Sequence, residues 1–287
     1  MKESDLIINR NGSIYHLKLK PEELPDLILV AGDPGRIEMI SDHFDRVEFK
    51  RQNREFVSHI GWLNGKRLLA LSTGIGPDNM DIVMNELDAL ANIDLKKRES
   101  LEHHRTLTIV RIGTCGTLHP DIPVGAFSLA THGLGLDGSL HFYKDLEKVT
   151  DLELTREFIS QSGWPSFLAS PYIIPGSKEL IQKLAPEGIS GITATGAGFY
   201  GPQGRELRLR TAFPGMLDAL TKFSYKDHRI INCEMETSSL YGLGSMLDHQ
   251  VASICVILAN RATGECLRTI KNNEEKLISY VLEKMTS

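Results

Sequence analysis

The chain has 287 residues, of which 41% are hydrophobic and 24% are charged, and its formal net charge is −5. This length suits one large α/β domain or two small ones with a substantial core, and the composition excludes disordered and fibrous proteins. The acidic balance gives no basis for a nucleic-acid-binding surface, so any anion site must be a local cluster of Arg or Lys. The first residues lack an apolar signal segment, and no run approaches the roughly 18 apolar residues that span a bilayer, so we expect a cytoplasmic protein without membrane contact.

Short apolar runs bounded by Gly, Pro or Asp alternate with segments of helical period. We expect strands over residues 27–31, 68–72, 107–112, 126–131, 189–194, 229–234 and 251–259. We expect helices over residues 78–90, 177–184, 236–247 and 272–285. This alternation predicts a three-layer α/β/α fold, in which helices cover both faces of a parallel or mixed sheet. We treat residues 1–287 as a single domain in which residues 1–13 form an N-terminal extension.

Cysteines and charged residues add two smaller expectations. Cys115, Cys233, Cys255 and Cys266 have no CxxC spacing, and three of them lie in apolar strand-like runs, so we expect buried reduced thiols rather than disulfides or a zinc site. Residues 94–105 interleave acidic and basic side chains, which is typical of a solvated loop or helix end.

Residues 31–36 follow the first expected strand and read Ala-Gly-Asp-Pro-Gly-Arg. Pro34 suits the first position of a helix, and Gly32 permits close backbone approach at the end of the strand. A helix N-terminus at this point can hold an anion, with Arg36 adding positive charge. The alternative is a plain strand-to-helix turn. Neither GxGxxG nor a Gly-Lys-Ser/Thr step is present, which excludes the Rossmann and Walker phosphate sites.

Residues 108–116 read Thr-Ile-Val-Arg-Ile-Gly-Thr-Cys-Gly and place an arginine inside an apolar strand. Arg111 must find partners there, because an unpaired buried charge is costly. A structural salt bridge would satisfy it. A glycine-rich turn over 113–116, with the Thr114 hydroxyl and exposed N–H groups, would instead make a phosphate cradle. Since open α/β sheets bind ligands at the carboxyl ends of their strands, we expect this turn and the Gly32 turn to meet at one anion.

Residues 199–205 read Phe-Tyr-Gly-Pro-Gln-Gly-Arg. Phe199 offers a stacking face, Gln203 can donate and accept hydrogen bonds, and Arg205 presents a fork of donors to carbonyl oxygens. A pyrimidine base carries a matching edge. The alternative is a surface turn, because Gly-Pro and Gln-Gly steps interrupt regular structure.

Residues 232–239 read Asn-Cys-Glu-Met-Glu-Thr-Ser-Ser, where an expected strand gives way to an expected helix. Glu234 and Glu236 flank Met235 and point to the same side of an extended backbone. The helix dipole alone would explain Glu236 well and Glu234 poorly. A carboxylate that accepts hydrogen bonds from vicinal hydroxyls would make this segment a ribose site.

Five motifs in this chain resemble those of the nucleoside phosphorylase family, and within it the uridine phosphorylases. In chain order they are Gly-Asp-Pro-x-Arg, Arg-Ile-Gly-Thr-x-Gly, Phe-Tyr-x-x-Gln-x-Arg, Glu-Met-Glu and Asn-Arg. The similarity covers about residues 14–265 and includes His16 and residues 54–56, 72–76 and 136–142. Each motif is short, but five in the right order are specific. The resemblance implies a mixed, partly barrel-like sheet and a homodimer with shared active sites, assembled into a hexamer.

The resemblance also implies a role for individual residues. Inorganic phosphate would be bound by Gly32, Arg36, Arg111 and Thr114, and by Arg54 of a neighbouring subunit. The ribose would be bound by Met235, Glu236 and, across the same interface, His16. The base would be bound by Phe199, Gln203, Arg205 and Arg261. Catalysis would rest on Arg111, Glu236, Gln203 and Arg205.

The implied reaction is reversible phosphorolysis of uridine, with deoxyuridine and thymidine as further candidate substrates, to uracil and ribose 1-phosphate. It needs no cofactor or metal, since inorganic phosphate is the co-substrate. Residues 77–79 are Pro-Asp-Asn where some bacterial members have Gly-Pro-Ser and bind a monovalent cation, so no such cation is expected.

Three other activities remain as alternatives. A nucleosidase on the same fold would use water, but such relatives tend to lose the phosphate arginines. Purine-cleaving relatives have Ser-Asp where residues 260–261 are Asn-Arg, so this chain lacks the acid that would protonate a purine. The third alternative is a non-catalytic nucleoside-binding protein, which would not need the arginine cluster together with Glu236.

Overall fold

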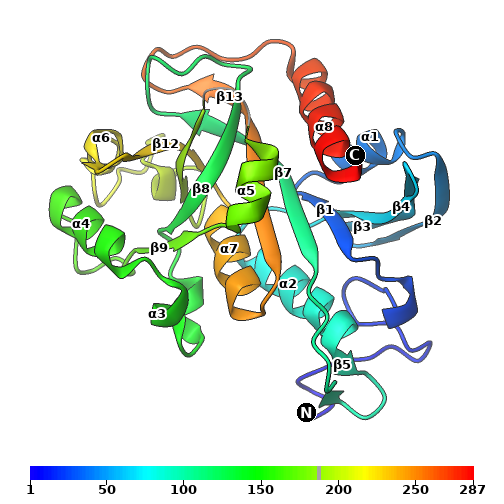
Figure 1. The fold of residues 1–287 in the computed structure, drawn as a ribbon. Coiled ribbons are helices and arrows are strands. Elements are labelled where there is room, and N and C mark those ends of the chain that lie inside the picture. Colours follow the sequence, from blue (N-terminus) through cyan, green and yellow to red (C-terminus); the bar gives the residue numbers. More distant parts are fainter. Residues whose placement is uncertain (186–188) are drawn as a thin grey trace.

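The computed structural model describes residues 1–185 and 189–287, and its ribbon is shown in Figure 1. The strands are β1 (Leu27–Ala31), β2 (Arg46–Asn53), β3 (Phe56–Leu63), β4 (Lys66–Ser72), β5 (Ile93–Asp94), β6 (Glu99–Ser100), β7 (Thr108–Thr117), β8 (Phe127–Gly135), β9 (Tyr172–Pro175), β10 (Ser190–Thr195), β11 (Ser224–Tyr225), β12 (His228–Glu234) and β13 (Gln250–Asn260). The helices are α1 (Pro34–Ser41), α2 (Pro77–Asn92), α3 (Leu146–Val149), α4 (Leu152–Ser162), α5 (Lys178–Leu184), α6 (Met216–Lys222), α7 (Thr237–Met246) and α8 (Ile270–Thr286).

A mixed sheet runs through the molecule in the order β11-β12-β10-β8-β13-β7-β1-β4-β3-β2, and β9 pairs with β8. Strand β12 also pairs with β7 in antiparallel register, so β7, β13, β8, β10 and β12 form a closed ring. The prediction of a mixed, partly barrel-like α/β sheet is therefore confirmed. Strands β1, β4, β7 and β13 run parallel, and their carboxyl ends meet at one edge.

Helices cover both faces of this sheet. Side chains alternate along β1, so Ile28 and Val30 join a core with α2 and α7, whereas Leu29 and Ala31 join a core with α1, α5 and α8. In Figure 1, α8 lies beside α1, and α2 lies near α7. Burial on both faces explains why the central strands read as continuous apolar runs.

The expected strands and helices all occur, but α3, α4, α6, β9 and β11 were not predicted. Three other features also differ from the expectations. Strand β7 continues through Thr117, so residues 113–116 are strand and not the glycine-rich turn that we expected. The hairpin of β2 and β3 was missed, because β2 alternates exposed and partly buried side chains and has no apolar run. Residues 94–105 are largely exposed, as expected, but include the short hairpin of β5 and β6 rather than a helix end.

The N-terminal extension packs against the remainder of the chain. Leu6 is buried in the core beside α2, Ile8 forms an isolated bridge with Ile14, and the amino group of Met1 donates to the Arg98 carbonyl. The extension therefore contributes to folding as well as to the surface.

The thiols largely follow the prediction. Cys115, Cys233 and Cys255 are buried, Cys266 is exposed, and all four are free. Within residues 1–185 and 189–287, no helix is both long enough and apolar enough to cross a membrane.

Candidate active site

A cavity of about 780 Å³ lies at the carboxyl edge where β1, β7 and β12 end. It is lined by nine of the residues predicted from the sequence: Gly32, Arg36, Arg111, Thr114, Phe199, Gln203, Arg205, Met235 and Glu236. The segment after β1 and the end of β7 thus meet at one cavity, as expected. The sequence did not identify Glu55, Ile75, Asn79 or the two pocket cysteines Cys115 and Cys233 as lining residues.

The close approach expected at Gly32 is present. A Cβ on Gly32 would lie 3.1 Å from the carbonyl oxygen of Gly74, so a side chain would crowd the segment that follows β4. Helix α1 begins at Pro34, and the Asp33 side chain caps it by accepting from the Gly35 N–H at 2.9 Å. The cavity therefore opens beside a capped helix N-terminus, which favours a bound anion.

Arg36 lies on the first turn of α1 and is buried. Its Nη1 donates to the carbonyl oxygen of Ile112 at 3.2 Å, and its Nη2 pairs with the Glu274 carboxylate of α8. Its Nε has no hydrogen-bond partner among the residues that the structure describes. This Nε is itself buried in the wall of the cavity.

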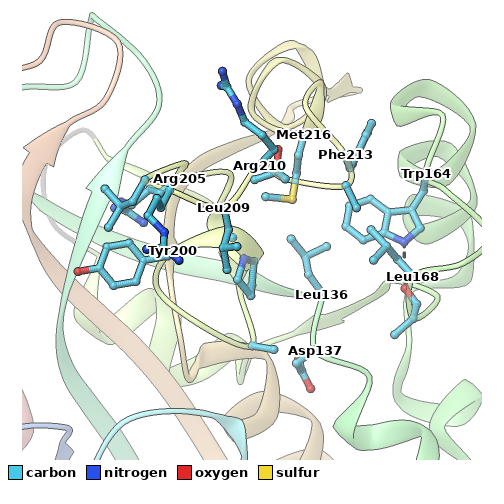
Figure 2. A pocket seen from close by; sticks show the side chains of 18 residues that line it. Leu136, Asp137, Trp164, Leu168, Tyr200, Arg205, Leu209, Arg210, Phe213 and Met216 are labelled. Atoms are coloured by element: carbon cyan, nitrogen blue, oxygen red, sulfur yellow. Dashed lines mark hydrogen bonds between the residues drawn. The ribbon is translucent and has the colours of Figure 1, made fainter.

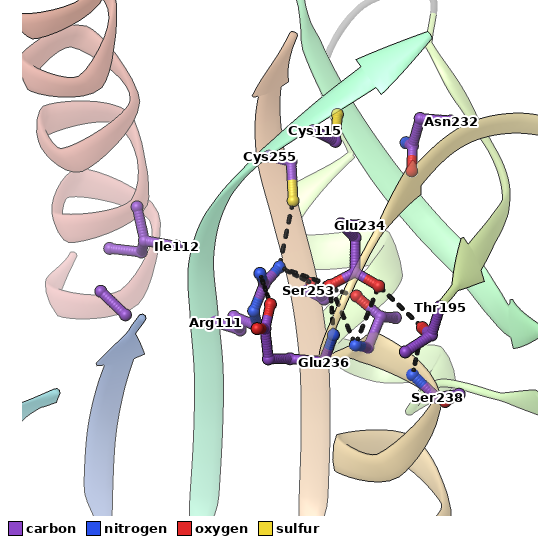
Figure 3. Close-up of polar contacts among 12 residues, drawn as sticks. Arg111, Ile112, Cys115, Thr195, Asn232, Glu234, Glu236, Ser238, Ser253 and Cys255 are labelled. Atoms are coloured by element: carbon purple, nitrogen blue, oxygen red, sulfur yellow. Dashed lines mark hydrogen bonds and ion pairs between the residues drawn. The ribbon is translucent and has the colours of Figure 1, made fainter. Parts of the chain in front are cut away.

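Arg111 lies within β7 and is the centre of a buried polar network (Figure 3). Its Nη1 lies 3.0 Å from Glu234 Oε2 and also donates to Ser253 Oγ at 3.3 Å and Cys255 Sγ at 3.2 Å. Its Nη2 pairs with Glu236. The salt bridge that was the structural alternative for Arg111 is therefore present, and it lies in the wall of the cavity. Within the described part of the chain, Nε again has no partner.

The two carboxylates of the Glu-Met-Glu segment have different partners, and the helix-end role that was the alternative for Glu236 belongs to Glu234. Glu234 accepts from the backbone N–H groups of Glu236 and Thr237 at the start of α7, and from the Thr195 hydroxyl at 2.7 Å. Glu236 makes no cap hydrogen bond to α7 and accepts instead from the Gly76 N–H at 2.7 Å. Glu234 therefore stabilises the helix start, and Glu236 faces the cavity.

Burial and neighbouring charges shift the pKa values of Arg111 and Glu236. Burial alone would lower the pKa of Arg111, but the carboxylates of Glu234 and Glu236 raise it above its usual range. Burial raises the pKa of Glu236, and Glu234 adds to the effect, while Arg111 opposes it. Arg111 is thus always a cation, and two carboxylates already surround it.

Three residues of the 199–205 segment contact one another at the other end of the cavity. Arg205 Nη1 donates to the Gln203 side-chain oxygen at 2.6 Å and to the Phe199 carbonyl at 2.7 Å. Its guanidinium carbon lies 3.9 Å from the centroid of the Phe199 ring. Gln203 is buried and its amide donates to the carbonyl oxygen of Glu234 at 3.3 Å. Arg205 therefore covers one face of the Phe199 ring.

Arg261 lies behind this segment and does not line the cavity. Its Nη1 donates to the main-chain oxygen of Gln203 at 2.5 Å. The neighbouring Asn260 is buried, and its amide donates to the carbonyl oxygens of His119 and Ile122. Arg261 therefore supports the turn of residues 199–205, and the Asn260 side chain is fully used in backbone contacts.

His16 and Arg54 also lie outside the cavity of their own chain. His16 Nδ1 contacts Glu86 at 2.7 Å, and its carbonyl accepts from the Asn53 amide. The Arg54 guanidinium lies 5.8 Å from the Tyr15 ring centroid. The two residues therefore share one surface.

A second cavity of about 860 Å³ lies beside the 199–205 segment (Figure 2). Its wall is largely apolar and includes Leu136, Trp164, Leu209, Phe213 and Met216. Arg205 lines both cavities. The turn that carries Arg205 is thus backed by an apolar hollow instead of packed side chains.

Asp88, His104 and His249 form a cluster whose spacing would suit a metal ion. His249 Nδ1, however, accepts a hydrogen bond from the Leu107 N–H at 3.2 Å, so the ring proton must reside on Nε2, which faces Asp88 at 3.3 Å. A ligating histidine uses an unprotonated nitrogen and donates from the other one. This cluster is therefore a close approach of His249 to Asp88, between α2 and the turn before β13, and Nε2 makes no hydrogen bond within the described residues.

The family assignment follows from the sequence as a whole. A sequence model of the Phosphorylase superfamily matches residues 26–283, and the chain belongs to this superfamily. The predicted resemblance to nucleoside phosphorylases is confirmed.

The relatives narrow the comparison further. The uridine phosphorylase of Haemophilus influenzae is 29% identical over 281 residues, which cover 94% of this chain and 96% of that protein. The uridine phosphorylase of Escherichia coli K12 is 27% identical over 282 residues, covering 95% and 96% of the two chains. Among solved structures, a Trypanosoma brucei nucleoside phosphorylase described as showing uridine phosphorylase activity has a TM-score of 0.87 and 27% identity, covering 98% of this chain and 99% of that one.

Proposed function

We propose that this chain is an enzyme of the pentosyltransferase type that catalyses the reversible phosphorolysis of uridine to uracil and ribose 1-phosphate. One observation carries the proposal. A continuous series of contacts links Arg36, through the Ile112 carbonyl and β7, to Arg111, and through the Glu-Met-Glu segment to Gln203 and Arg205. Cations for phosphate, a carboxylate for ribose and an amide–guanidinium pair for a base therefore line one cavity.

The phosphate end suits an attacking anion. Arg36 and Arg111 both line the cavity beside the Thr114 side chain and the start of α1. Bound there, phosphate would be placed beneath the sugar carbon that it attacks, and such positioning can lower a barrier by roughly 7–11 kcal/mol.

The sugar end suits ribose. The Glu236 carboxylate keeps acceptor positions free beyond its contacts with Arg111 and Gly76, and Met235 lines the adjacent wall. Glu236 would accept from the sugar hydroxyls, and its negative charge would favour the cation-like sugar of the transition state.

The base end suits a leaving group that takes up negative charge. As the C–N bond breaks, Gln203 and Arg205 would stabilise the departing uracil, and one such donor can contribute about 3 kcal/mol. Neither a covalent intermediate nor a cofactor or metal is required. Deoxyuridine and thymidine are further candidate substrates.

We further propose that the active unit is a homodimer, assembled into a hexamer in the cytoplasm. Two carboxylates surround Arg111, and Glu274 pairs with Arg36, so one subunit offers little excess positive charge to a phosphate dianion. Arg54 and His16 share a surface outside their own cavity. Donated by a partner, they would supply the missing charge and a contact to the ribose.

The first test is uridine cleavage with and without inorganic phosphate. We expect uracil release only with phosphate, loss of turnover in Arg111→Ala, and no change in Arg105→Ala, a surface arginine that pairs with Asp26. Equal rates in the absence of phosphate would favour a nucleosidase. Efficient cleavage of inosine would contradict the pyrimidine assignment.

The second test addresses the shared site. Arg54→Ala and Arg111→Ala subunits are each expected to be inactive alone. After unfolding and refolding together, a heterodimer would hold one intact site, so the mixture should recover about a quarter of wild-type activity. A mixture that stays inactive, or an active monomer in light scattering, would refute the dimer.

A further inference from the structure

Glu274 is a buried carboxylate that the proposed reaction does not use. It lies in the second turn of α8 and is 9% exposed. Its neighbours along the inner face of that helix, Leu277 and Ile278, are fully buried in the core shared with α1. A carboxylate at such a position is costly unless it is paired, and its partner is the guanidinium of Arg36.

A contribution to the free energy of folding does not explain well why Glu274 and Arg36 are paired in the core. Replacing a buried ion pair by apolar side chains is often neutral or stabilising, so the pair is weak evidence of a contribution to folding. The contact instead has a geometric effect. The Ile112 carbonyl holds Nη1 of Arg36 at 3.2 Å, and Glu274 holds Nη2 from another element.

Two fixed contacts define the plane of a guanidinium. Because both terminal nitrogens are held from β7 and α8, the Arg36 side chain cannot swing out of the wall of the cavity without breaking one of them. Arg36 is therefore presented to the cavity in a single orientation.

We propose that Glu274 is a positioning residue for the co-substrate: it holds Arg36 in the orientation that binds phosphate. This inference rests on the proposed function, because it takes phosphate as the ligand of Arg36. The C-terminal helix, which carries no residue lining the cavity, thereby sets the affinity for phosphate.

Two substitutions separate geometry from charge. Glu274→Asp keeps the charge but withdraws the carboxylate by one methylene, whereas Glu274→Gln keeps the length and an acceptor oxygen. The matched control is Glu275→Gln on the adjacent, half-exposed residue, which contacts His43. We expect Glu274→Asp to raise the KM for phosphate about tenfold, with the KM for uridine unchanged, and Glu274→Gln and Glu275→Gln to stay within about threefold of wild type.

Phosphate binding is measured separately from turnover, by the rise in melting temperature that inorganic phosphate produces in each folded variant. If phosphate raises the melting temperature less in Glu274→Asp than in wild type, and in no other variant, the proposal is supported even if uridine proves not to be the substrate. A phosphate response like that of wild type in Glu274→Asp, an equal loss in both variants at residue 274, or a parallel rise of both KM values would overturn it.

Discussion

Gly113 is the position at which one methyl group should have the largest effect on the site. Arg111 lies two residues earlier on the same strand, and its guanidinium folds back across the Gly113 α-carbon. A Cβ at Gly113 would lie 2.2 Å from Arg111 Nη1 and 2.7 Å from Cys255 Sγ. Gly113→Ala must therefore displace the guanidinium from its present place.

The size of the effect follows from these distances. An ordinary contact begins at 3.4 Å, so Nη1 has to retreat by about 1.2 Å. A displacement of about 1 Å at a positioned group can cost roughly 100-fold in rate. Overpacking of this kind costs about 1–3 kcal/mol in the free energy of unfolding. We expect the alanine variant to fold with reduced stability and to lose at least about 100-fold in kcat/KM.

The assay is steady-state uridine phosphorolysis, accompanied by urea unfolding of each protein. Gly116→Ala on the same strand is the control for the unfolding measurement, because its Cβ would meet nothing closer than 3.6 Å. A Gly113→Ala enzyme whose kcat/KM stays within about threefold of wild type would refute the view that Arg111 needs this space.

Two further predictions concern titration and thiol reactivity. Burial, together with the nearby His228, lowers the pKa of His132 to about 4. The unfolded chain binds a proton below about pH 6.5, so the stability due to neutral His132 is intact above that pH and falls as the pH drops toward 4. Between pH 7 and 5, His132→Gln should lose about 2 kcal/mol less unfolding free energy than wild type, and parallel urea profiles would contradict this. In the native protein at about pH 8, a thiol reagent should label only Cys266, because the other three thiols are buried and burial raises the pKa of Cys233 to about 12. Fast labelling of a second thiol, counted by mass spectrometry, would show that the cavity wall opens.

The elements predicted most accurately from the sequence are those whose position is decided by burial alone. The buried strands could be located because both of their faces are apolar, and Pro34 with Gly32 marked the start of α1 correctly. The hairpin of β2 and β3 was not predicted, because β2 is an edge strand with polar side chains and therefore has no apolar run.

Within the site, residue identity was more predictable than residue role. Of the residues predicted to bind phosphate, ribose and base within one chain, the cavity gathers all but Arg261. The helix-capping role of Glu234, and the cover of Phe199 by Arg205, depend on which of several possible partners each side chain meets after folding. Glu274 lies far along the chain from Arg36, so no local spacing could have paired them.

The antiparallel contact of β12 with β7 has a consequence for how the enzyme forms. Asn232 pairs with Thr117, and Cys233 with Gly116, which joins segments that are distant in the sequence. Loop closure of this kind is slow and comes before the contact is gained. Arg111 meets Glu234 and Glu236 only when this ring of strands has closed. The capacity to bind substrate should therefore appear late in folding. Added nucleoside or phosphate should lower the rate of unfolding of the native protein, and it should leave the rate of the first collapse during refolding unchanged.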